Sequence, residues 1–379
     1  MNSSDDNIPP SPLSVITQLQ FLRRQTTLLF VLIGITIAAF FLTRSLAATG
    51  RSLHRADAQQ WHQMGLQRLA AGDTAGAITA LRHAAAGDRE NREVALVLAR
   101  AHGAAGDVDA ARAVLLQLRD RLPDDPEINL RLARLERENG RPEEAIRYYQ
   151  GALLGLWGTQ QLEMRRELRV ELIEFLLTHD MKARALSESL LLAGEISDTP
   201  EAHTRVGELL LSADDPGRAL LQFEMALERA PRDADARARA GEAAFRAGSY
   251  RLASRHLARV PDHPRAAVLR PVVNLIVSLD PLAPGLSSRE RHRRIAAAAE
   301  QISAEVSTCR ADQAQLEPLT KELGLLRTQL RRRSRTDDPV DADLFALATF
   351  AERAADACGR EAPIFRALDL IAAQHGASP

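Results

Sequence analysis

The sequence repeats itself every 34 residues between Ala58 and about Ala267, and this repetition constrains the fold more than any other feature. A small residue recurs at one offset in six units, and a shift of six residues separates the first three units from the last three. The recurring small residues are Ala77, Ala111, Ala145, Ala185, Ala219 and Ala253. A unit of this length cannot bury its own apolar face, so the units are predicted to stack into a solenoid.

Each unit is predicted to form two antiparallel helices joined by a tight turn. A glycine or an aspartate stands where the first helix must end, since these residues tolerate the left-handed backbone conformation that ends many helices. A small residue in the first helix lets the second helix approach closely. The turn residues are Gly72, Gly106, Gly140, Asp180, Asp214 and Gly248, and the small residues are Gly65, Ala99, Ala133, Gly207 and Gly241.

These offsets resemble those of the tetratricopeptide repeat family, whose units place a large residue, a leucine, a small residue, an alanine, an aromatic residue, a second alanine and a proline in this order. The resemblance covers six units and implies an all-α fold, a right-handed α-solenoid of helix pairs. It also implies that a concave wall binds protein domains or peptides. The fourth unit departs most, with Ile173 in the small-residue place and Ser189 in the aromatic place. We therefore expect looser or re-angled packing in that unit.

An uncharged apolar segment precedes the repeats. From Gln25 to Thr43 no charged residue occurs, and its apolar part would form a helix roughly 28 Å long, close to the thickness of a bilayer's hydrocarbon core. We predict a single uncleaved transmembrane helix. A cleaved signal peptide is an alternative, because Ser45, Leu46 and Ala47 form a small-x-small site. A buried core helix is a second alternative.

Charge alone does not orient the predicted anchor. Two arginines directly precede it and three follow it, so the positive-inside count is nearly balanced. Cys309 and Cys358 each end an apolar helix face and are therefore expected to face a core. A disulfide between them would favour the oxidising periplasm, whereas two unpaired buried thiols would suit a reducing cytosol. We expect a cytoplasmic N-terminus and periplasmic repeats at the bacterial inner membrane, with cytoplasmic repeats as the alternative.

The predicted organisation has seven parts in chain order. They are a disordered tail (1–24), a transmembrane helix (25–43), a linker (44–57), repeats one to three (58–159), a joint (160–165), repeats four to six (166–267) and a C-terminal helical cap (268–379). Around and within the cap, helices are expected near 264–279, 287–309, 313–333, 341–358 and 362–374. The cap is predicted to cover the apolar end of the last repeat.

Composition and motifs exclude several classes of function. The net charge of -1 does not suit a nucleic-acid binder, and the sequence contains no catalytic, cofactor-binding or metal-binding motif. His102 and His203 are expected on helix surfaces. The basic runs 289–294 and 331–335 are expected to be solvated helix ends, with lipid or an acidic partner as the alternative. We therefore predict a protein that is not an enzyme and that needs no cofactor or metal.

The ninth position of each unit is expected to face the concave wall. It holds Leu66, Arg100, Arg134, Glu174, Glu208 and Glu242, so the charge changes sign between the third and fourth units. One hypothesis is a bipolar groove that orients an extended protein partner. The alternative is that neighbours such as Glu138 and Arg246 neutralise both rows. Trp157, between the two sets of repeats, is expected to fill a gap or to anchor a partner.

These features together predict a membrane-anchored scaffold for protein–protein interactions in the bacterial cell envelope, acting in assembly or export. Only two of the 49 basic residues are lysines, a bias that fits a GC-rich bacterial genome. A periplasmic chaperone or holdase for unfolded segments is one alternative function. An accessory regulatory subunit of an envelope enzyme is another.

Overall fold

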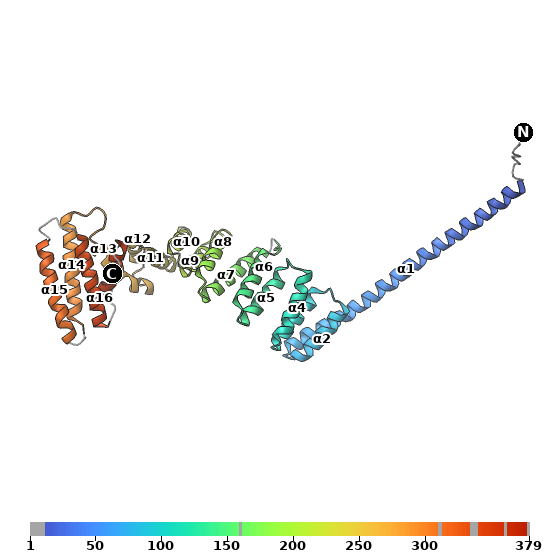
Figure 1. Cartoon of the computed structure of the whole chain (residues 1–379), viewed down its shortest axis with the longest axis horizontal. Coiled ribbons are helices and arrows are strands. Elements are labelled where there is room, and N and C mark those ends of the chain that lie inside the picture. The colour runs from blue at the N-terminus through green and yellow to red at the C-terminus, as the bar shows by residue number, and fades with distance from the viewer. Residues whose placement is uncertain (1–11, 159–160, 310–312, 334–339, 360–361, 377–379) are drawn as a thin grey trace, which may run out of the picture. The chain divides into compact units, whose positions relative to one another are not determined.

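The computed structural model describes the backbone of residues 12–158, 161–309, 313–333, 340–359 and 362–376. It describes side chains for residues 32–45, 55–158, 161–309, 316–332, 340–359 and 362–376. Every regular element longer than one turn within these ranges is an α-helix, which confirms the predicted all-α class over that part of the chain (Figure 1). The chain divides between Trp157 and Gly158 into two compact units.

The first unit contains three helix pairs. Its helices are α1 (Pro12–Ala70), α2 (Thr74–Gly87), α3 (Arg92–Ala104), α4 (Val108–Arg121), α5 (Pro126–Glu138) and α6 (Pro142–Leu154). The end of α1 packs on α2, α3 packs on α4, and α5 packs on α6. Each pair also contacts the next, through α2 with α3 and α4 with α5, so the core is continuous along the unit.

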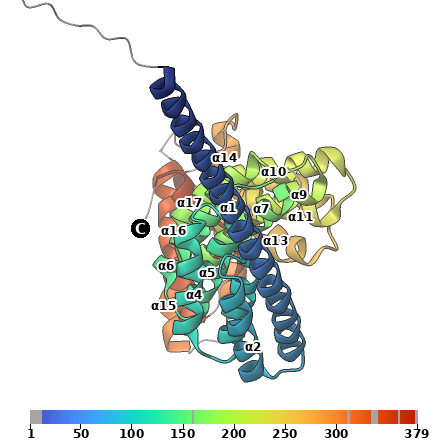
Figure 2. The same cartoon turned by 90° about the vertical axis from the view of Figure 1, so that its right-hand side faces the viewer.

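The second unit contains three further pairs and a helical cap. Its helices are α7 (Leu162–Thr178), α8 (Lys182–Ala193), α9 (Pro200–Ser212), α10 (Pro216–Arg229), α11 (Ala234–Arg246), α12 (Tyr250–Ala258), α13 (Pro264–Leu279), α14 (Ser288–Ser307), α15 (Gln313–Arg333), α16 (Val340–Cys358) and α17 (Pro363–Gln374). Helices α9, α10 and α11 lie side by side (Figure 2), and α14, α15 and α16 form a bundle of their own.

The turn inside each pair is built as the sequence predicts. All six predicted turn residues have a positive φ angle, from 56° at Asp180 to 79° at Gly72. In three of the six turns an aspartate directly afterwards caps the second helix, as Asp73 does by accepting a hydrogen bond of 2.9 Å from the N–H of Gly76. The left-handed residue reverses the chain, and the cap satisfies a free N–H group at the start of the second helix.

Close contact between paired helices requires the predicted small residues. A Cβ atom at Gly207 would lie 2.7 Å from Cε1 of Phe223, and one at Gly65 would lie 2.6 Å from Cγ of Leu81. All six recurring alanines are buried as well. A larger side chain at Gly65 or Gly207 would clash with the second helix, so these small residues allow the two helices of a pair to pack closely.

The fourth repeat exchanges the sizes of two contact residues. Ile173 and Ser189 stand at the offsets that Gly207 and Phe223 occupy one repeat later, and both are fully buried. The Ser189 hydroxyl donates a hydrogen bond of 2.7 Å to the carbonyl of Ala185. A large residue on the first helix thus replaces the large residue on the second, so the contact stays filled.

The cap helices begin and end within two residues of their predicted bounds. Pro271 lies inside α13 without ending it, and Ser287 caps α14 by accepting a hydrogen bond from the N–H of Glu290. The Sγ atoms of Cys309 and Cys358 lie 2.12 Å apart as a disulfide that joins the ends of α14 and α16. Helix α17 packs on α13 and α16, which places the C-terminal helix against the first helix after the repeats.

Helix α1 is longer than the sequence suggests. It includes 12–24 and 44–57, where a disordered tail and a linker are predicted, because no proline interrupts the chain between Pro12 and Ala70. Within the described residues no helix is both long and apolar enough to cross a membrane. Residues 25–31 of the predicted span lie outside the described side chains.

Candidate partner-binding surface

Three glutamates of the predicted wall lie on successive first helices of the second unit, α7, α9 and α11. Each forms an ion pair with an arginine from the helix that stacks next to it, α9, α11 or α13. The pairs are Glu174 with Arg205, Glu208 with Arg239 at 2.7 Å, and Glu242 with Arg265. We call these six residues the paired wall. Its charges alternate along the stack, so an approaching partner meets no field of a single sign.

The hypothesis of an unpaired acidic row is therefore wrong for the second unit. Arg205 and Arg239 stand three residues before the glutamates of their own helices, on the same helix face. Arg246, named beforehand as a neutralising residue, instead pairs with Asp214 at 2.9 Å. The exposed members of these pairs contribute little to stability, about 0–1 kcal/mol each.

The first unit places the other three wall residues differently. Leu66 is partly buried against a core cluster that includes Ala77 and Leu81, so it contributes to packing. Arg100 on α3 and Arg134 on α5 are both exposed. No carboxylate oxygen in the described part of the chain lies within 4.0 Å of the Arg100 guanidinium. The two arginines are the part of the predicted groove that faces solvent in this unit.

A buried polar position escaped the sequence reasoning. The fourth position of the first helix holds Asn129, Arg169 and His203 in repeats three, four and five, and all three are buried. Arg169 forms ion pairs with Glu188 at 2.6 Å and with Glu195 at 3.2 Å. Because this is the large-residue position of the repeat pattern, the period itself marks it as interior.

His102 and His203 are likewise buried and not on helix surfaces as expected. His203 contacts Gln222 through Nδ1 at 2.8 Å and Asp198 through Nε2 at 2.9 Å. His102 lies 3.3 Å from Asp107. Each ring has a polar partner within hydrogen-bond distance. Both histidines therefore have structural roles between helices.

An electrostatic contact joins the second and third repeats. Arg92 on α3 binds Asp125, the cap residue of α5, at 2.5 Å and Glu127 at 2.7 Å. Burial alone would raise the pKa of Asp125, but hydrogen bonds from Arg92 and from the N–H of Ile128 hold it below its ordinary value. Asp125 is therefore ionised at neutral pH and stabilises the junction in that form.

We expect Asp125→Asn to lower the free energy of unfolding by about 1–2 kcal/mol at neutral pH. A carboxyl whose pKa is depressed by folding stabilises the fold above its unfolded pKa, and this stabilisation is lost as the pH falls through its folded pKa. The difference from wild type should therefore begin to shrink below about pH 4 and vanish only below the depressed folded pKa of Asp125. Thermal melts at several pH values measure it. Asp109→Asn is the control, because Asp109 pairs with Arg112 but its side chain is 92% exposed.

The indole of Trp157 is held by its own helix pair. Its Nε1 donates a hydrogen bond of 2.9 Å to the carbonyl of Ala152 near the end of α6, and the side chain is partly buried. This contact gives Trp157 a role in ending α6. Whether it also anchors a partner stays a prediction.

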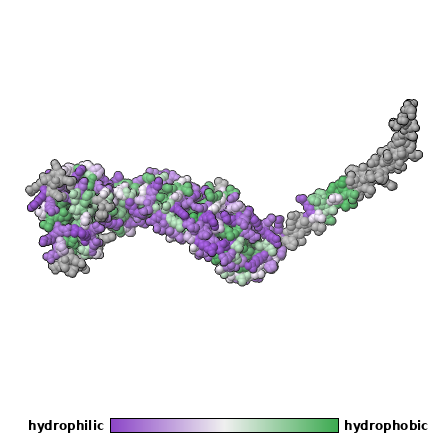
Figure 3. Space-filling view, viewed as in Figure 1, coloured by the Kyte–Doolittle hydropathy of each residue, from purple (hydrophilic) through white to green (hydrophobic). Residues whose placement is uncertain are grey.

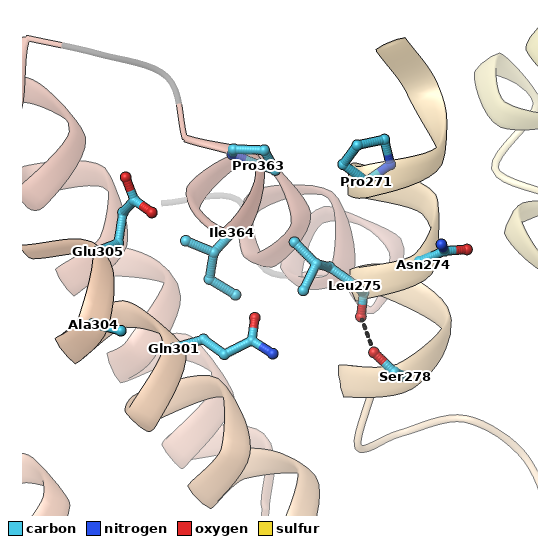
Figure 4. A pocket seen from close by; sticks show the side chains of 9 residues that line it. All are labelled: Pro271, Asn274, Leu275, Ser278, Gln301, Ala304, Glu305, Pro363 and Ile364. Atoms are coloured by element: carbon cyan, nitrogen blue, oxygen red, sulfur yellow. Dashed lines mark hydrogen bonds between the residues drawn. The ribbon is translucent and has the colours of Figure 1, made fainter. Parts of the chain in front are cut away.

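An open cleft of about 510 Å³ lies in the cap between α13, α14 and the start of α17. Leu275, Ile364 and Gln301 point toward one another across it (Figure 4). Pro271, Pro363 and Ala304 add apolar surface to its walls, and Asn274, Ser278 and Glu305 add polar groups. The cleft contains no cluster of acids, bases or nucleophiles. Its chemistry suits packing against an apolar group.

About half of the described arginines in the two basic runs have a carboxylate partner. Arg293 and Arg294 both pair with Glu290, at 2.8 Å and 3.2 Å. Arg331 lies 3.5 Å from Glu300, while residues 334 and 335 of the second run lie outside the described residues. Among the residues that the structure describes, no group of three or more histidines, cysteines or acids is placed to hold a metal ion.

The geometry defines stacked helix pairs with charged walls and no reactive cluster among the described side chains. Residues 68–135 match the family described as "Tetratricopeptide repeat", so this part of the chain is similar to that family. The match runs from the end of α1 through most of α5. No curated protein sequence matches the chain. Tetratricopeptide repeats are protein-interaction scaffolds that bind partners or peptides in their groove.

Several solved structures are similar in fold. Pseudomonas aeruginosa PilF shares 17% identity, with 58% of this chain and 98% of that chain covered and a TM-score of 0.36. PilW, a type IV pilus biogenesis factor, shares 18% identity, with coverages of 56% and 98% and a TM-score of 0.34. YrrB, with an unusual peptide-binding site, shares 18% identity, with coverages of 50% and 97% and a TM-score of 0.38. Likenesses at this level carry no information about partners.

Proposed function

We propose that this protein is a membrane-anchored scaffold that holds protein partners in the bacterial cell envelope through its tetratricopeptide repeats. The observation that carries the proposal is the exposed apolar surface of α1. Leu32, Phe41 and Leu42 are 60%, 63% and 63% exposed, and green side chains cover this stretch of the helix (Figure 3). A surface of this kind is unfavourable in water and favourable in lipid.

Helix α1 also connects the proposed anchor directly to the repeats. It continues from the apolar stretch to Ala70, which is part of the first helix pair. The paired wall is charged throughout, and this favours a partner bound by polar contacts over a holdase that grips unfolded apolar segments. The Cys309–Cys358 disulfide supports a periplasmic location for the repeats, because such bonds persist in oxidising compartments.

Cell fractionation of the full chain tests the location. We expect the wild type to stay in the membrane after carbonate extraction, protease to reach the repeats in intact spheroplasts, and alkylation to trap a disulfide. Ile35→Arg with Ile37→Arg should release the chain, since a charge at the centre of a span costs roughly 2.5–3.5 kcal/mol. Repeats protected until the inner membrane is broken would overturn the periplasmic assignment.

The same membranes test the scaffold role. After mild cross-linking and detergent extraction, proteins attached to the full chain are identified by mass spectrometry. Arg100→Glu with Arg134→Glu is expected to reduce the recovered partner at low salt, while Arg82→Glu with Arg89→Glu on the same unit should not. A partner recovered equally with both variants would exclude these two arginines from the binding wall.

A further inference from the structure

The second helix of the sixth repeat, α12, carries a row of arginines without acidic partners. Arg251, Arg255 and Arg259 are all exposed and stand four residues apart, which places them on one face about 6 Å apart along the axis. No carboxylate oxygen of a described residue lies within 4.0 Å of any of the three guanidinium groups. The arginines of the paired wall, by contrast, each have a carboxylate partner.

Helix stability alone does not account for this row. Arg255 in the last turn and Arg259 at the C-cap are favoured there by the helix dipole. Arg251 lies in the first turn of α12, where the dipole disfavours a cation. The row therefore runs along the whole helix, including the end at which a positive charge is unfavourable.

An exposed apolar row lies on the neighbouring second helix, α10. Leu221 and Met225 are 58% and 37% exposed, and they occupy in the fifth repeat the places of Arg255 and Arg259 in the sixth. Helices α10 and α12 both pack on α11, and a side-chain contact also joins them, since His256 Nε2 lies 3.8 Å from Glu224 Oε1. These two residues stand next to Arg255 and Met225 in the sequence, so the cationic row and the apolar row meet at this contact. We call the five residues of the two rows the outer strip.

A half-buried histidine on α12, His256, is affected by the positive charges of the outer strip. Burial lowers the pKa of His256, and the charges of Arg237, Arg259 and Arg255 lower it further. Glu224 on α10 is the carboxylate that faces the His256 ring.

We propose that the outer strip binds an acidic amphipathic helix of a protein partner. Carboxylates spaced three or four residues apart on that helix would face Arg251, Arg255 and Arg259, and its apolar side chains would cover Leu221 and Met225. The two chemistries are separated on two parallel helices, and this separation matches the two faces of an amphipathic helix. The strip lies on second helices, so it is a surface distinct from the wall of the proposed function.

Charge around the strip favours a helix over an anionic bilayer. Glu228 at the end of α10 and Asp262 just after α12 are both exposed. A flat anionic membrane pressed against the strip would bring negative charge to both carboxylates, whereas a helix can place a neutral or basic side chain opposite Glu228, which shares a face of α10 with Leu221 and Met225. The proposal therefore commits to a protein segment, and binding to lipid is an outcome of the test.

The test uses the full chain in phosphatidylcholine nanodiscs and a fluorescent synthetic helix with glutamate at every fourth position and leucines beside them. We expect wild type to bind this peptide, and to bind its Glu→Gln counterpart at least about tenfold more weakly. Arg251→Glu with Arg255→Glu and Arg259→Glu should lose the acidic peptide to a similar degree. Leu221→Ser with Met225→Ser should weaken both peptides. Fluorescence anisotropy at low and high salt measures the binding.

The matched control reverses three other exposed arginines, Arg82, Arg89 and Arg332, and should bind as wild type does. If the triple reversal on α12 does not fold, the Arg→Gln triple takes its place, with the same loss expected. Equal affinity of wild type and the α12 variant for the acidic peptide would overturn the proposal. So would binding to vesicles containing phosphatidylglycerol without binding to the peptide, which would assign the strip to lipid.

Discussion

Replacing Phe223 by alanine is expected to lower the free energy of unfolding of the second unit by about 3–5 kcal/mol. The ring is fully buried and fills the contact at Gly207, where no Cβ atom stands in its way. Truncation removes the buried ring and leaves a cavity. The two closely packed helices cannot fill this cavity without moving. Thermal and urea melts followed by circular dichroism measure the change.

Leu221→Ala is the matched control, two residues earlier on the same helix. Leu221 is 58% exposed, so its truncation should change stability by less than about 0.5 kcal/mol. The control also tests the outer strip separately from the core, because it removes an apolar contact without disturbing the repeat. Equal melting temperatures for Phe223→Ala and Leu221→Ala would show that Phe223 is not at a helix contact.

The architecture is readable from the sequence because one physical requirement recurs in every repeat. A turn residue with positive φ and a small residue facing a large one must return at each period, and so they appear at fixed spacing. The same reasoning places α13 from Pro264 to Leu279, since proline starts the helix and Asp280 follows an apolar run. Pro271 does not end it, because the buried residues Val273 and Ile276 hold the helix on its neighbours.

The charge pattern of the surface is harder to predict from the sequence, because its ion pairs join residues at different positions of the repeat. Reading the ninth position alone gives a row of glutamates, while their partners Arg205 and Arg239 stand at the sixth position of the next units. Comparing the repeats at one position therefore reveals the glutamates but not the arginines that pair with them. The outer strip was not predicted for a related reason. Leu221 and Arg255 occupy the same position of successive repeats, but one is apolar and the other is charged, so no repeated pattern marks them.

The burial of several polar residues was also not predicted, because the hydrogen-bond partners that allow it are not evident from the sequence. His203 is interior because Asp198 and Gln222 meet its two ring nitrogens, and neither partner lies at the expected spacing for a histidine site. Polar residues are usually assigned to the surface. The period overrides that rule, because the same offset holds Asn129 and Arg169, both buried.

Ser189→Phe should destabilise the fourth repeat by about 1–3 kcal/mol, because Ile173 already fills the space that an aromatic ring takes one repeat later. Ile173→Gly should cost about 3–5 kcal/mol, since it empties that space and adds the backbone freedom of glycine. Ser187→Phe is the control for the first change, because Ser187 is exposed on the same helix.

The double variant Ile173→Gly with Ser189→Phe recreates the pairing of Gly207 with Phe223, so its destabilisation should be smaller than the sum of the single changes by roughly 1–3 kcal/mol. A favourable coupling of this size arises only if the two side chains share one space, which the repeat spacing requires and which full burial of both residues supports. Denaturant melts of the four proteins give the coupling energy directly. Additive single effects would mean that the fourth helix pair packs by a different contact, and that the exchange of sizes at these offsets is a coincidence.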